Sequence, residues 1–347
     1  MLVSKLKNWA KTLFIILVGA VYALAIISIV LMYWYWAVNL NKPEVIGVSF
    51  SQPQAERYGV DWQANYSALL DDLNFKNLRI AAYWDRTEPT QGQFDFSQTD
   101  WMVEQAKKRG AKVTLNIGQK LIRSPECYYP SWLNKNDPAQ VQTQIDPYLA
   151  AVVNRYKDNP TIEAWQVENE FLLKSFGNCP GANLTNSQLK REVELVRGLD
   201  KTRPIVLTQS DQFGFPLKGP FADVFGISLY RYVWSSLFDG YYRYPQDGNY
   251  NWLKAAWIQF LTGQQIKIHE LQAEAWGPVG NEYLSFNEAS KTMSPRQFSE
   301  NIAYGRQSQI KNFDLWGAEW WYWLKENGRP EMWQSVKDLV ANSKSAS

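Results

Sequence analysis

Eight short runs of β-branched and aromatic residues, most of them separated by helix-like stretches, limit the folds available to this sequence. Each run has the length and composition that are typical of a β-strand. The runs are Glu44 to Phe50, Asn77 to Trp84, Lys112 to Gly118, Ile162 to Glu170, Pro204 to Ser210, Val224 to Tyr230, Ile266 to Trp276 and Phe313 to Trp323. Strands that alternate with helices predict an α/β fold built on a parallel sheet.

The number of strand candidates favours a closed sheet. Eight strands with intervening helices predict a (β/α)8 TIM barrel, and a doubly wound open sheet is the competing interpretation. No Gly-x-Gly-x-x-Gly loop follows the first run, which weakens the case for an open sheet that binds a dinucleotide. In a barrel, the C-terminal ends of the strands meet at one face, and enzymes with this fold place their sites there.

The N-terminal part of the chain carries a charge-free apolar run from Thr12 to Val38. A helix of this length is long enough to cross the hydrocarbon core of a membrane, which is about 30 Å thick. A cleaved signal peptide is the competing interpretation, but its apolar region would be shorter and would end at small residues. This run ends instead in the bulky residues Tyr33 to Trp36, so the sequence predicts an uncleaved transmembrane anchor.

The charges beside this run predict its orientation. Lys5, Lys7 and Lys11 precede the run, and positive charges are typical of the cytoplasmic side of a membrane. We therefore expect residues 1–11 to be a short cytoplasmic N-terminus and residues 12–38 to be the transmembrane helix. Residues 39–347 are then expected to form one extracytoplasmic domain.

The two cysteines gain meaning from an extracytoplasmic location, because that compartment is oxidising. Cys127 and Cys179 both fall in loop-like segments that contain Pro or Gly. The sequence predicts a disulfide between these loops, and two free buried thiols are the alternative.

Composition and charge exclude several classes of function. A formal net charge of +2 supplies no basic field for nucleic acid. The single histidine, His269, and the two cysteines are too few for a zinc site with imidazole and thiolate ligands. This histidine also lies near the start of its strand, away from the face where a Ser-His-Asp triad would be needed. We therefore expect neither a metal nor a cofactor.

Two glutamates at the ends of predicted strands suggest a chemistry. Glu170 ends the fourth run, in the segment WQVENEF, and Glu274 lies near the end of the seventh. Two carboxylates at one face of a barrel are the minimum requirement for glycoside hydrolysis. An amphipathic edge strand, with Glu168 and Glu170 on its wet face, is the competing interpretation of WQVENEF.

Three separated motifs resemble the retaining glycoside hydrolases of clan A, the cellulase-like families 5, 39 and 42 among them. The motifs are the Asn169-Glu170 pair, a second Glu near the end of the seventh run, and the stretch from Asn77 to Val113. Within that stretch, Arg79 and Trp84 precede the motifs EP and GQFDF in the expected order. The resemblance covers most of the chain after the apolar run, and it implies a TIM barrel that cleaves a glycan.

The resemblance also implies roles for individual residues. It makes Glu170 the general acid/base and Glu274 the nucleophile. It also implies that Asn169 binds the sugar 2-hydroxyl and that Arg79 is a partner of the nucleophile. Tyr230 would be a further partner, from the sixth strand, and Trp323 would form the floor under the sugar in the cleaved position.

Two further tryptophans, Trp84 and Trp276, lie at or near predicted strand ends. We expect them to bind sugar, because flat aromatic rings stack on the apolar faces of sugars. Glu168, Glu270 and Gln272 are expected to form a buried polar ladder below the site, paired with Arg79 or with each other, and not to be catalytic. They lie earlier in their strands than the catalytic pair.

The sequence departs from the family 5 pattern at two strand ends. Where that family often has His, this chain has Gln119 after the third run and Ser228 in the sixth. These differences bear on substrate preference and leave the carboxylate pair unaffected.

Taken together, the residues predict a membrane-anchored, extracytoplasmic, retaining glycoside hydrolase that acts on a β-linked oligo- or polysaccharide. Retention through a glycosyl-enzyme intermediate requires catalytic carboxyl groups roughly 5 to 5.5 Å apart. A transglycosylase that uses the same site is one alternative. A non-catalytic, membrane-tethered barrel that binds glycan is the other.

Overall fold

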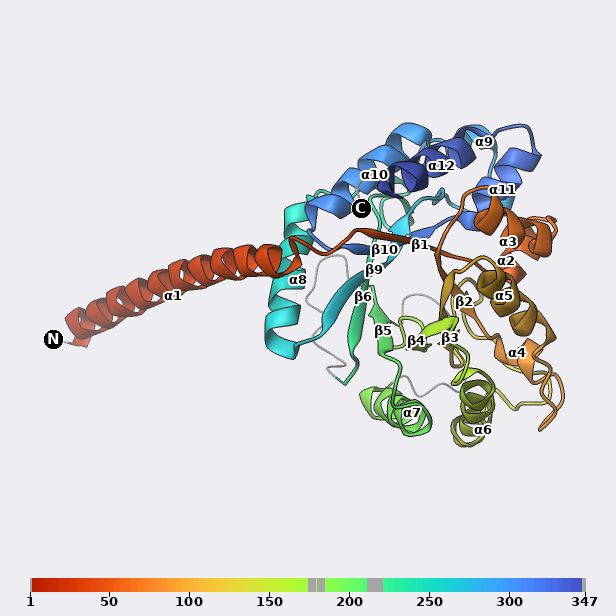
Figure 1. Ribbon diagram of the computed structural model, residues 1–347. Coiled ribbons are helices and arrows are strands. Elements are labelled where there is room, and N and C mark those ends of the chain that lie inside the picture. Colours follow the sequence, from red (N-terminus) through yellow and green to blue (C-terminus); the bar gives the residue numbers. More distant parts are fainter. Residues whose placement is uncertain (1, 174–178, 180–184, 211–220, 345–347) are drawn as a thin grey trace.

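The computed structural model describes residues 2–173, 179, 185–210 and 221–344 (Figure 1). Its main element is a closed barrel of parallel strands in the order β1-β10-β9-β6-β5-β4-β3-β2. These eight strands are β1 Val45–Ser49, β2 Asn77–Ala81, β3 Lys112–Ile117, β4 Ile162–Val167, β5 Ile205–Gln209, β6 Val224–Leu229, β9 Gln265–Gln272 and β10 Asn312–Trp316. The predicted (β/α)8 barrel is therefore confirmed, and the open sheet is excluded.

Helices surround the barrel (Figure 1). They lie between successive strands except between β5 and β6, where the described residues contain no helix. Several of them begin at a Ser, Thr or Asp whose side chain accepts a hydrogen bond from the first helical turn, for example Asp137 and Thr185. The helices are α2 Gln52–Arg57, α3 Trp62–Asp71, α4 Trp84–Thr87, α5 Ser97–Lys108, α6 Pro138–Tyr156, α7 Asn186–Leu199, α8 Gly248–Thr262, η1 Asn281–Tyr283, α9 Phe286–Ala289, α10 Pro295–Gln307, α11 Ala318–Glu326 and α12 Glu331–Lys344.

Several strands end earlier than the sequence predicts, and the eighth shows the reason most clearly. Strand β10 stops at Trp316 because Gly317 follows it with φ 151°, a conformation that favours glycine. A Cβ atom at Gly317 would lie only 2.9 Å from the carbonyl oxygen of Ala273. The chain turns there and continues as α11, so the predicted strand from Phe313 to Trp323 is half strand and half helix.

One element between β6 and α8 is absent from the sequence prediction. It is an antiparallel hairpin of β7 Tyr232–Ser235 and β8 Gly240–Arg243. The hairpin follows the C-terminal end of a barrel strand, so it belongs to the rim where a site is expected.

The upper interior of the barrel is polar. Arg79 on β2 donates hydrogen bonds to Ser49 on β1 and to Gln166 on β4. Because β2 and β4 are not neighbours in the sheet, the bond between Arg79 and Gln166 crosses the interior. The strands therefore bury apolar side chains against the helices and direct a polar network into the barrel.

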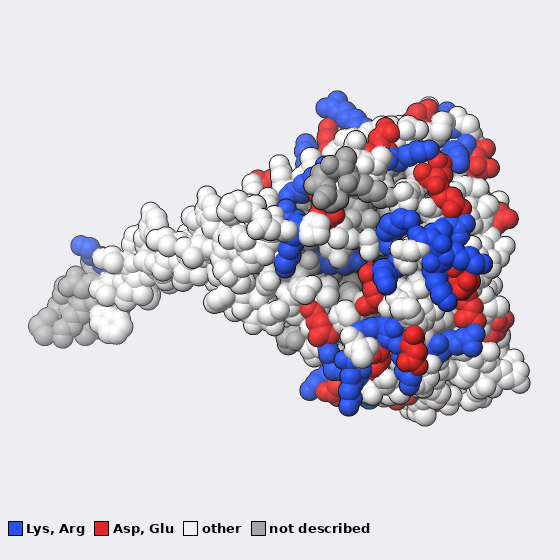
Figure 2. All heavy atoms as spheres, viewed as in Figure 1, with Lys and Arg blue, Asp and Glu red and all other residues white. Residues whose placement is uncertain are grey.

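Helix α1, Leu2–Asn39, projects away from the barrel (Figure 1). The most apolar 18-residue window of its segment Trp9–Asn39 has a mean hydropathy of 2.9, and none of that window is buried in the protein. Figure 2 shows both signs of charge spread over the barrel, whereas α1 is uncharged along nearly all of its length. By length and composition this helix could be a membrane span or a signal sequence.

Candidate active site

The chain makes a tight, left-handed path where β4 ends. Glu168 and Glu170 have φ values of 60° and 47°, an uncommon region for residues other than glycine. The strand alternation therefore stops at Val167, and the two carboxylates do not share a face. The predicted polar ladder is wrong at Glu168, whose carboxylate instead accepts the backbone N–H groups of Gln119 and Lys120 at 3.0 and 2.6 Å.

Glu170 lies buried among hydroxyl groups from neighbouring strands. Its Oε1 atom accepts hydrogen bonds from the hydroxyls of Ser210 and of Ser228, the second at 2.6 Å. Its backbone N–H donates to Thr208 Oγ1 at 2.9 Å, and its carbonyl oxygen accepts from Lys120 Nζ at 3.0 Å. The position of this carboxylate is therefore fixed from β3, β5 and β6 together.

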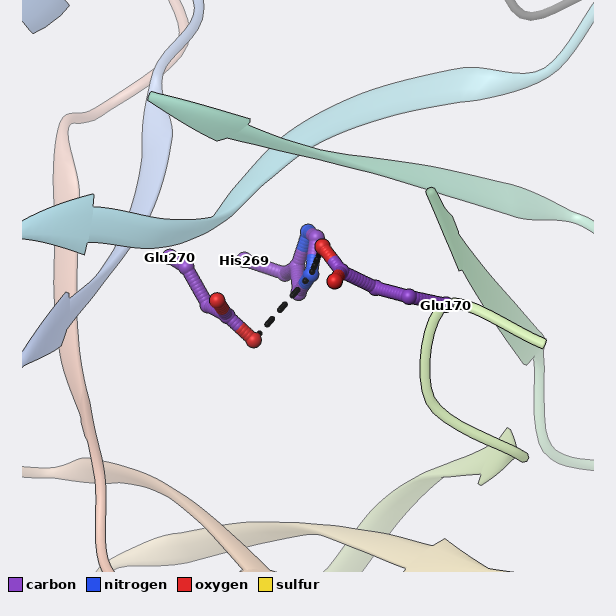
Figure 3. A group of neighbouring side chains, drawn as sticks. All are labelled: Glu170, His269 and Glu270. Atoms are coloured by element: carbon purple, nitrogen blue, oxygen red, sulfur yellow. Dashed lines mark ion pairs between the residues drawn. The ribbon is translucent and has the colours of Figure 1, made fainter. Parts of the chain in front are cut away.

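A β-bulge in β9 directs two successive side chains toward the interior. Along β6, Ile227 pairs with Ile268 and Ser228 pairs with Glu270, so His269 is the extra residue on β9. A bulge of this kind re-aims a side chain that strict alternation would send outward. His269 and Glu270 consequently both face Glu170 (Figure 3).

The Glu170 and Glu270 carboxylates approach each other closely. One oxygen atom from each, together with one ring nitrogen of His269, lie within 4.8 Å of one another (Figure 3). The Nε2 atom of His269 is 3.4 Å from an oxygen of each carboxylate. A histidine between two glutamates therefore forms the centre of the site, and the expectation that His269 lies away from the catalytic face is wrong.

Glu270 is held by a cation and a phenol. Its Oε1 atom is 3.3 Å from Arg79 Nη1, and its Oε2 atom accepts a hydrogen bond from the Tyr230 hydroxyl at 2.9 Å. Burial raises the pKa of Glu270. The charge of His269 and its hydrogen bond, the charge of Arg79 and the hydrogen bond from Tyr230 act in the opposite direction, and the net effect lowers this pKa to about 2. Glu270 is therefore a carboxylate at neutral pH.

Glu274 has a different environment, two residues beyond the end of β9. Its Oε1 atom accepts a hydrogen bond from Arg123 Nη1 at 2.5 Å, and Arg123 Nη2 binds Glu319 at the same distance. Burial raises the pKa of Glu274, and Arg123 offsets this effect only in part. The expected pairing of Arg79 with Glu274 is wrong. The carboxylate partner of Arg79 is Glu270, and a pairing of Arg79 with the polar ladder is thereby confirmed at Glu270.

Arg79 also positions the asparagine that precedes Glu170. Its Nη2 atom donates to Asn169 Oδ1 at 2.6 Å, and the same oxygen accepts from Thr208 Oγ1 at 3.2 Å. Arg79 thus links β1, β2 and β4 with Glu270 on β9. The structure brings four of the predicted site residues together at one end of the barrel: Arg79, Asn169, Glu170 and Tyr230.

A metal ion is one chemical possibility for three neighbouring ligand atoms of Glu170, His269 and Glu270. The guanidinium of Arg79 already compensates Glu270, and a divalent cation would face this fixed positive charge. The cluster therefore fits an ion-pair network better than a metal centre.

The predicted aromatic residues occupy unlike positions. Trp276 is half-buried, and its ring meets Tyr230 edge to face at 5.0 Å between centroids. Trp84 is fully buried, donates to Glu88 and stacks on Tyr148, so the prediction that it binds sugar is wrong. It begins α4 instead of ending β2 and packs into the core between barrel and helices.

Trp323 also lies outside the strand in which it was predicted, because it belongs to α11. Its ring packs on Tyr58 and Phe286, with centroids 5.5 and 5.3 Å away. The aromatic residue that ends β10 is Trp316, and the guanidinium of Arg123 lies 4.0 Å above its ring. The sequence prediction missed Trp316, although the glycine after it was a signal that the strand ends there.

The loop after β3 contains one predicted residue, Cys127, and two cations that were not predicted, Lys120 and Arg123. Cys127 and Cys179 form the expected disulfide, with their Cα atoms 5.4 Å apart. The segment before Cys127 carries Lys120, which is fully buried beside Glu170, and Arg123. A long, Pro-containing loop gives no periodic signal, so only the fold shows that these two cations reach the site.

Together, the closed barrel and the carboxylates near the ends of its fourth and seventh strands define a barrel of the clan A glycoside hydrolase type. A family model described as Cellulase (glycosyl hydrolase family 5) matches residues 39–259. The chain belongs to this family. The matched segment contains Asn169 and Glu170 and ends before β9.

Relatives of known activity match parts of the chain. Endo-1,4-beta-xylanase A of Phanerodontia chrysosporium is 34% identical over 114 residues, which are 30% of this chain and 25% of that protein. Beta-galactosidase LacZ of Lactobacillus acidophilus is 23% identical over 213 residues, 53% of this chain and 30% of that protein. The chain therefore spans less than a third of the length of these relatives.

Solved structures of similar fold are more distant in sequence. The exo-beta-1,4-mannosidase Op5Man5 from Opitutaceae bacterium strain TAV5 superposes with a TM-score of 0.57 at 15% identity. The match covers 87% of this chain and 60% of that chain. At this identity the likeness concerns the fold.

Proposed function

We propose that this protein is a retaining glycoside hydrolase that cleaves a β-linked glycan, with Glu170 as acid/base and Glu270, in place of Glu274, as nucleophile. The observation that carries the proposal is the approach of one oxygen of Glu170 to within 4.8 Å of one oxygen of Glu270. Retaining enzymes need carboxyl groups about 5 to 5.5 Å apart, whereas inverting enzymes leave about 6.5 to 9.5 Å for a water molecule.

The two carboxylates would act in two steps. Glu270 attacks the anomeric carbon while Glu170 gives its proton to the departing glycosidic oxygen, which forms a glycosyl ester on Glu270. Glu170, now a carboxylate, removes a proton from water, and the water oxygen displaces Glu270 from the anomeric carbon. The first step requires Glu270 to be ionised, and its low pKa meets this requirement.

The neighbours of Glu270 support this assignment. Arg79 and Tyr230 hold its two oxygens, and Arg79 also holds Asn169, the residue that would bind the sugar 2-hydroxyl. Glu274 lacks these partners and has a raised pKa, which makes it the weaker nucleophile. In this proposal Glu274 positions Arg123 over Trp316, whose ring would form the floor under the sugar.

The names of two relatives, an endo-1,4-beta-xylanase and a beta-galactosidase, support a β-linked substrate. The family 5 membership agrees with a glycan substrate. Transglycosylation would use the same residues with a sugar in place of the water, so the acceptor distinguishes the two reactions.

We also propose that α1 remains as a membrane anchor, with residues 1–11 in the cytoplasm and residues 39–347 outside. The disulfide between Cys127 and Cys179 agrees with an oxidising compartment. The indole N–H of Trp252, on α8, donates to the carbonyl oxygen of Met32 in α1 at 2.9 Å. A signal peptide that is cleaved would leave this barrel residue without its partner.

The experiment is a screen of the full chain, in detergent, against aryl β-glycosides and β-linked polysaccharides. We expect cleavage with the β anomer as the first product by proton NMR, and added sugar acceptors reveal any transglycosylation. Glu326→Gln is the control, because Glu326 is exposed at the end of α11. An α anomer as first product would contradict retention, and binding without cleavage would contradict an enzyme.

A further inference from the structure

Helix α8 of the barrel packs against the C-terminal half of α1. Two indole N–H groups of α8 donate hydrogen bonds to it, Trp252 to Met32 O at 2.9 Å and Trp257 to Ser28 Oγ at 3.1 Å. Tyr35, three residues beyond Met32 in α1, is also buried. Figure 1 shows α8 at the edge of the barrel, running across the end of α1 while α1 leads away. The barrel is therefore in direct contact with the apolar helix and is not merely tethered to it by a linker.

If α1 spans a membrane, these contacts determine the depth of α8 in the bilayer. The charge-free run from Thr12 to Val38 is about 40 Å long at 1.5 Å per residue, so it exceeds a hydrocarbon core of about 30 Å. Aromatic residues favour the membrane interface, which places Tyr33 to Trp36 at the outer boundary of the core. Ser28 then lies about 6 Å deeper than Met32, inside the outer leaflet, and Trp257 reaches that depth.

The outer surface of α8 is unusual for a barrel helix. Its sequence, GNYNWLKAAWIQFLT, contains one charged residue, Lys254, and that residue is buried. Phe260 and Leu261 are 55% and 53% exposed at its C-terminal end. Helix α7 offers the contrast, since its exposed residues include Lys190, Glu194 and other charges.

The exposed apolar residues continue the surface of the span. The Phe260 ring lies 6.4 Å from Trp34 on α1 and 6.3 Å from Trp257, centroid to centroid. Exposed apolar groups beside a membrane helix would be costly in water and favourable at the acyl boundary. An interfacial helix buries its apolar face about 5 to 10 Å into that boundary, which matches the level of Ser28.

We propose that α8 is a second membrane contact, in which Trp257, Phe260 and Leu261 insert into the outer leaflet of a phospholipid bilayer. The partner is the lipid surface, and the proposal rests on the anchor proposed above. The barrel then lies on the membrane in one orientation, with α8 in the membrane plane. The direction in which the site faces relative to the membrane is then fixed as well.

The test uses the full chain in phospholipid nanodiscs with one introduced cysteine at a time. Phe260→Cys and Leu261→Cys report on α8, and Val21→Cys reports on the span. Tyr283→Cys is the water-exposed control, in η1 beyond the end of β9. Val21 and Tyr283 are 67% and 79% exposed in the protein, so a nitroxide label fits at both. The native cysteines are joined in a disulfide and do not react with the label.

Accessibility to oxygen and to a water-soluble nickel complex is then measured by electron paramagnetic resonance. We expect labels at 260 and 261 to follow the label at 21, with an oxygen-to-nickel accessibility ratio severalfold above that at 283. A high ratio at 21 with a low ratio at 260 and 261 would overturn the second contact and keep the anchor. A low ratio at 21 would overturn the anchor itself.

A second copy of the chain is the other candidate for covering this surface, and the spin labels would distinguish it from lipid. If a second copy of the chain covered Phe260 and Leu261, labels there would be immobilised and shielded from oxygen and nickel alike. That result would overturn the lipid contact. If lipid covers these residues, the labels should be equally accessible in nanodiscs that hold one copy of the chain and in nanodiscs that hold two.

Discussion

The Tyr230 hydroxyl donates a hydrogen bond to Glu270 Oε2 at 2.9 Å, while Arg79 approaches the other oxygen of the same carboxylate at 3.3 Å. The two partners come from the end of β6 and from β2, on different sides of the barrel. They fix the plane of the carboxylate and favour its ionised form. A nucleophile has these needs, because it must reach the anomeric carbon in one orientation and carry a negative charge.

The first prediction separates Glu270 from Glu274. Glu270→Gln should lower kcat on aryl β-glycosides by on the order of 10⁴-fold or more, because a neutral amide cannot form the glycosyl ester. Glu274→Gln should retain measurable turnover. A 2-deoxy-2-fluoro glycoside should trap the intermediate, and tandem mass spectrometry should find the added mass on Glu270. Added mass on Glu274 would restore Glu274 as the nucleophile.

The second prediction concerns Glu170 as acid/base. Glu170→Ala should lose activity mainly on substrates with poor leaving groups, because good leaving groups need little protonation. Azide should then raise the turnover of good substrates, since a small anion enters the space of the missing carboxylate and attacks the intermediate. The product should be a β-glycosyl azide. If Glu168→Ala showed this behaviour instead, the choice between the two glutamates would be wrong.

Much of the fold follows from patterns that the sequence displays. Eight runs of strand-forming residues stand at separations that fit one strand and one helix each, and all eight occur as barrel strands. The strands could be predicted because parallel strands are buried on both faces and are therefore rich in apolar and β-branched residues. The hairpin β7–β8 lies outside this regularity and was missed.

The site was harder to predict because its residues lie where the regular pattern stops. The alternation rule puts Glu270 and Glu274 on one face, with Glu274 higher, but the bulge at His269 and the early end of β9 at Gln272 change which carboxylate meets Glu170. A bulge leaves no clear mark in a single sequence. The left-handed residues after Val167 have the same effect on Glu168.

The third prediction concerns Arg123, which the loop before the disulfide places between two buried carboxylates. Arg123→Met should destabilise the protein by about 3 to 5 kcal/mol, because Glu274 and Glu319 would lose their shared cation. Urea unfolding at neutral pH measures this loss. Arg86→Met is the control, since its pair with Glu56 is partly exposed and should contribute less than about 1 kcal/mol.

A double variant makes the origin of this loss specific. Adding Glu274→Gln to Arg123→Met removes one of the two unpaired charges, so part of the lost stability should return. If the double variant were as unstable as the sum of the two single variants, the loss would come from packing on Trp316 and not from charge.

The fourth prediction compares two tryptophans. Trp316→Ala should raise KM for aryl glycosides about tenfold, because an aromatic face under the sugar is lost. Trp323→Ala should leave KM within about twofold, since Trp323 belongs to α11 and its ring packs on Tyr58 and Phe286. The reverse order of the two effects would place the sugar floor on α11.

The last prediction uses a buried carboxyl pair behind the site. Glu192 on α7 is fully buried, accepts a hydrogen bond from Gln188 at 2.9 Å and interacts with Glu168, which is buried as well. Burial raises the pKa of Glu192 to about 7, and the hydrogen bonds from Gln188 and Glu168 only moderate this effect. The folded protein therefore keeps a proton on Glu192 at pH values where the unfolded chain has already released it.

The sign of the pH dependence follows from this proton. Between about pH 4.5 and pH 7 the folded state binds more protons than the unfolded state, so the contribution of Glu192 to stability falls as pH rises through this window. Glu192→Gln keeps a neutral group and should raise the free energy of unfolding by about 3 kcal/mol near pH 8, with little effect near pH 4. Urea unfolding at both pH values measures the difference. Glu194→Gln, on the exposed face of the same helix, should change stability by less than about 0.5 kcal/mol at either pH. Equal stabilisation of Glu192→Gln at both pH values would mean that Glu192 does not hold a proton in the folded protein at neutral pH.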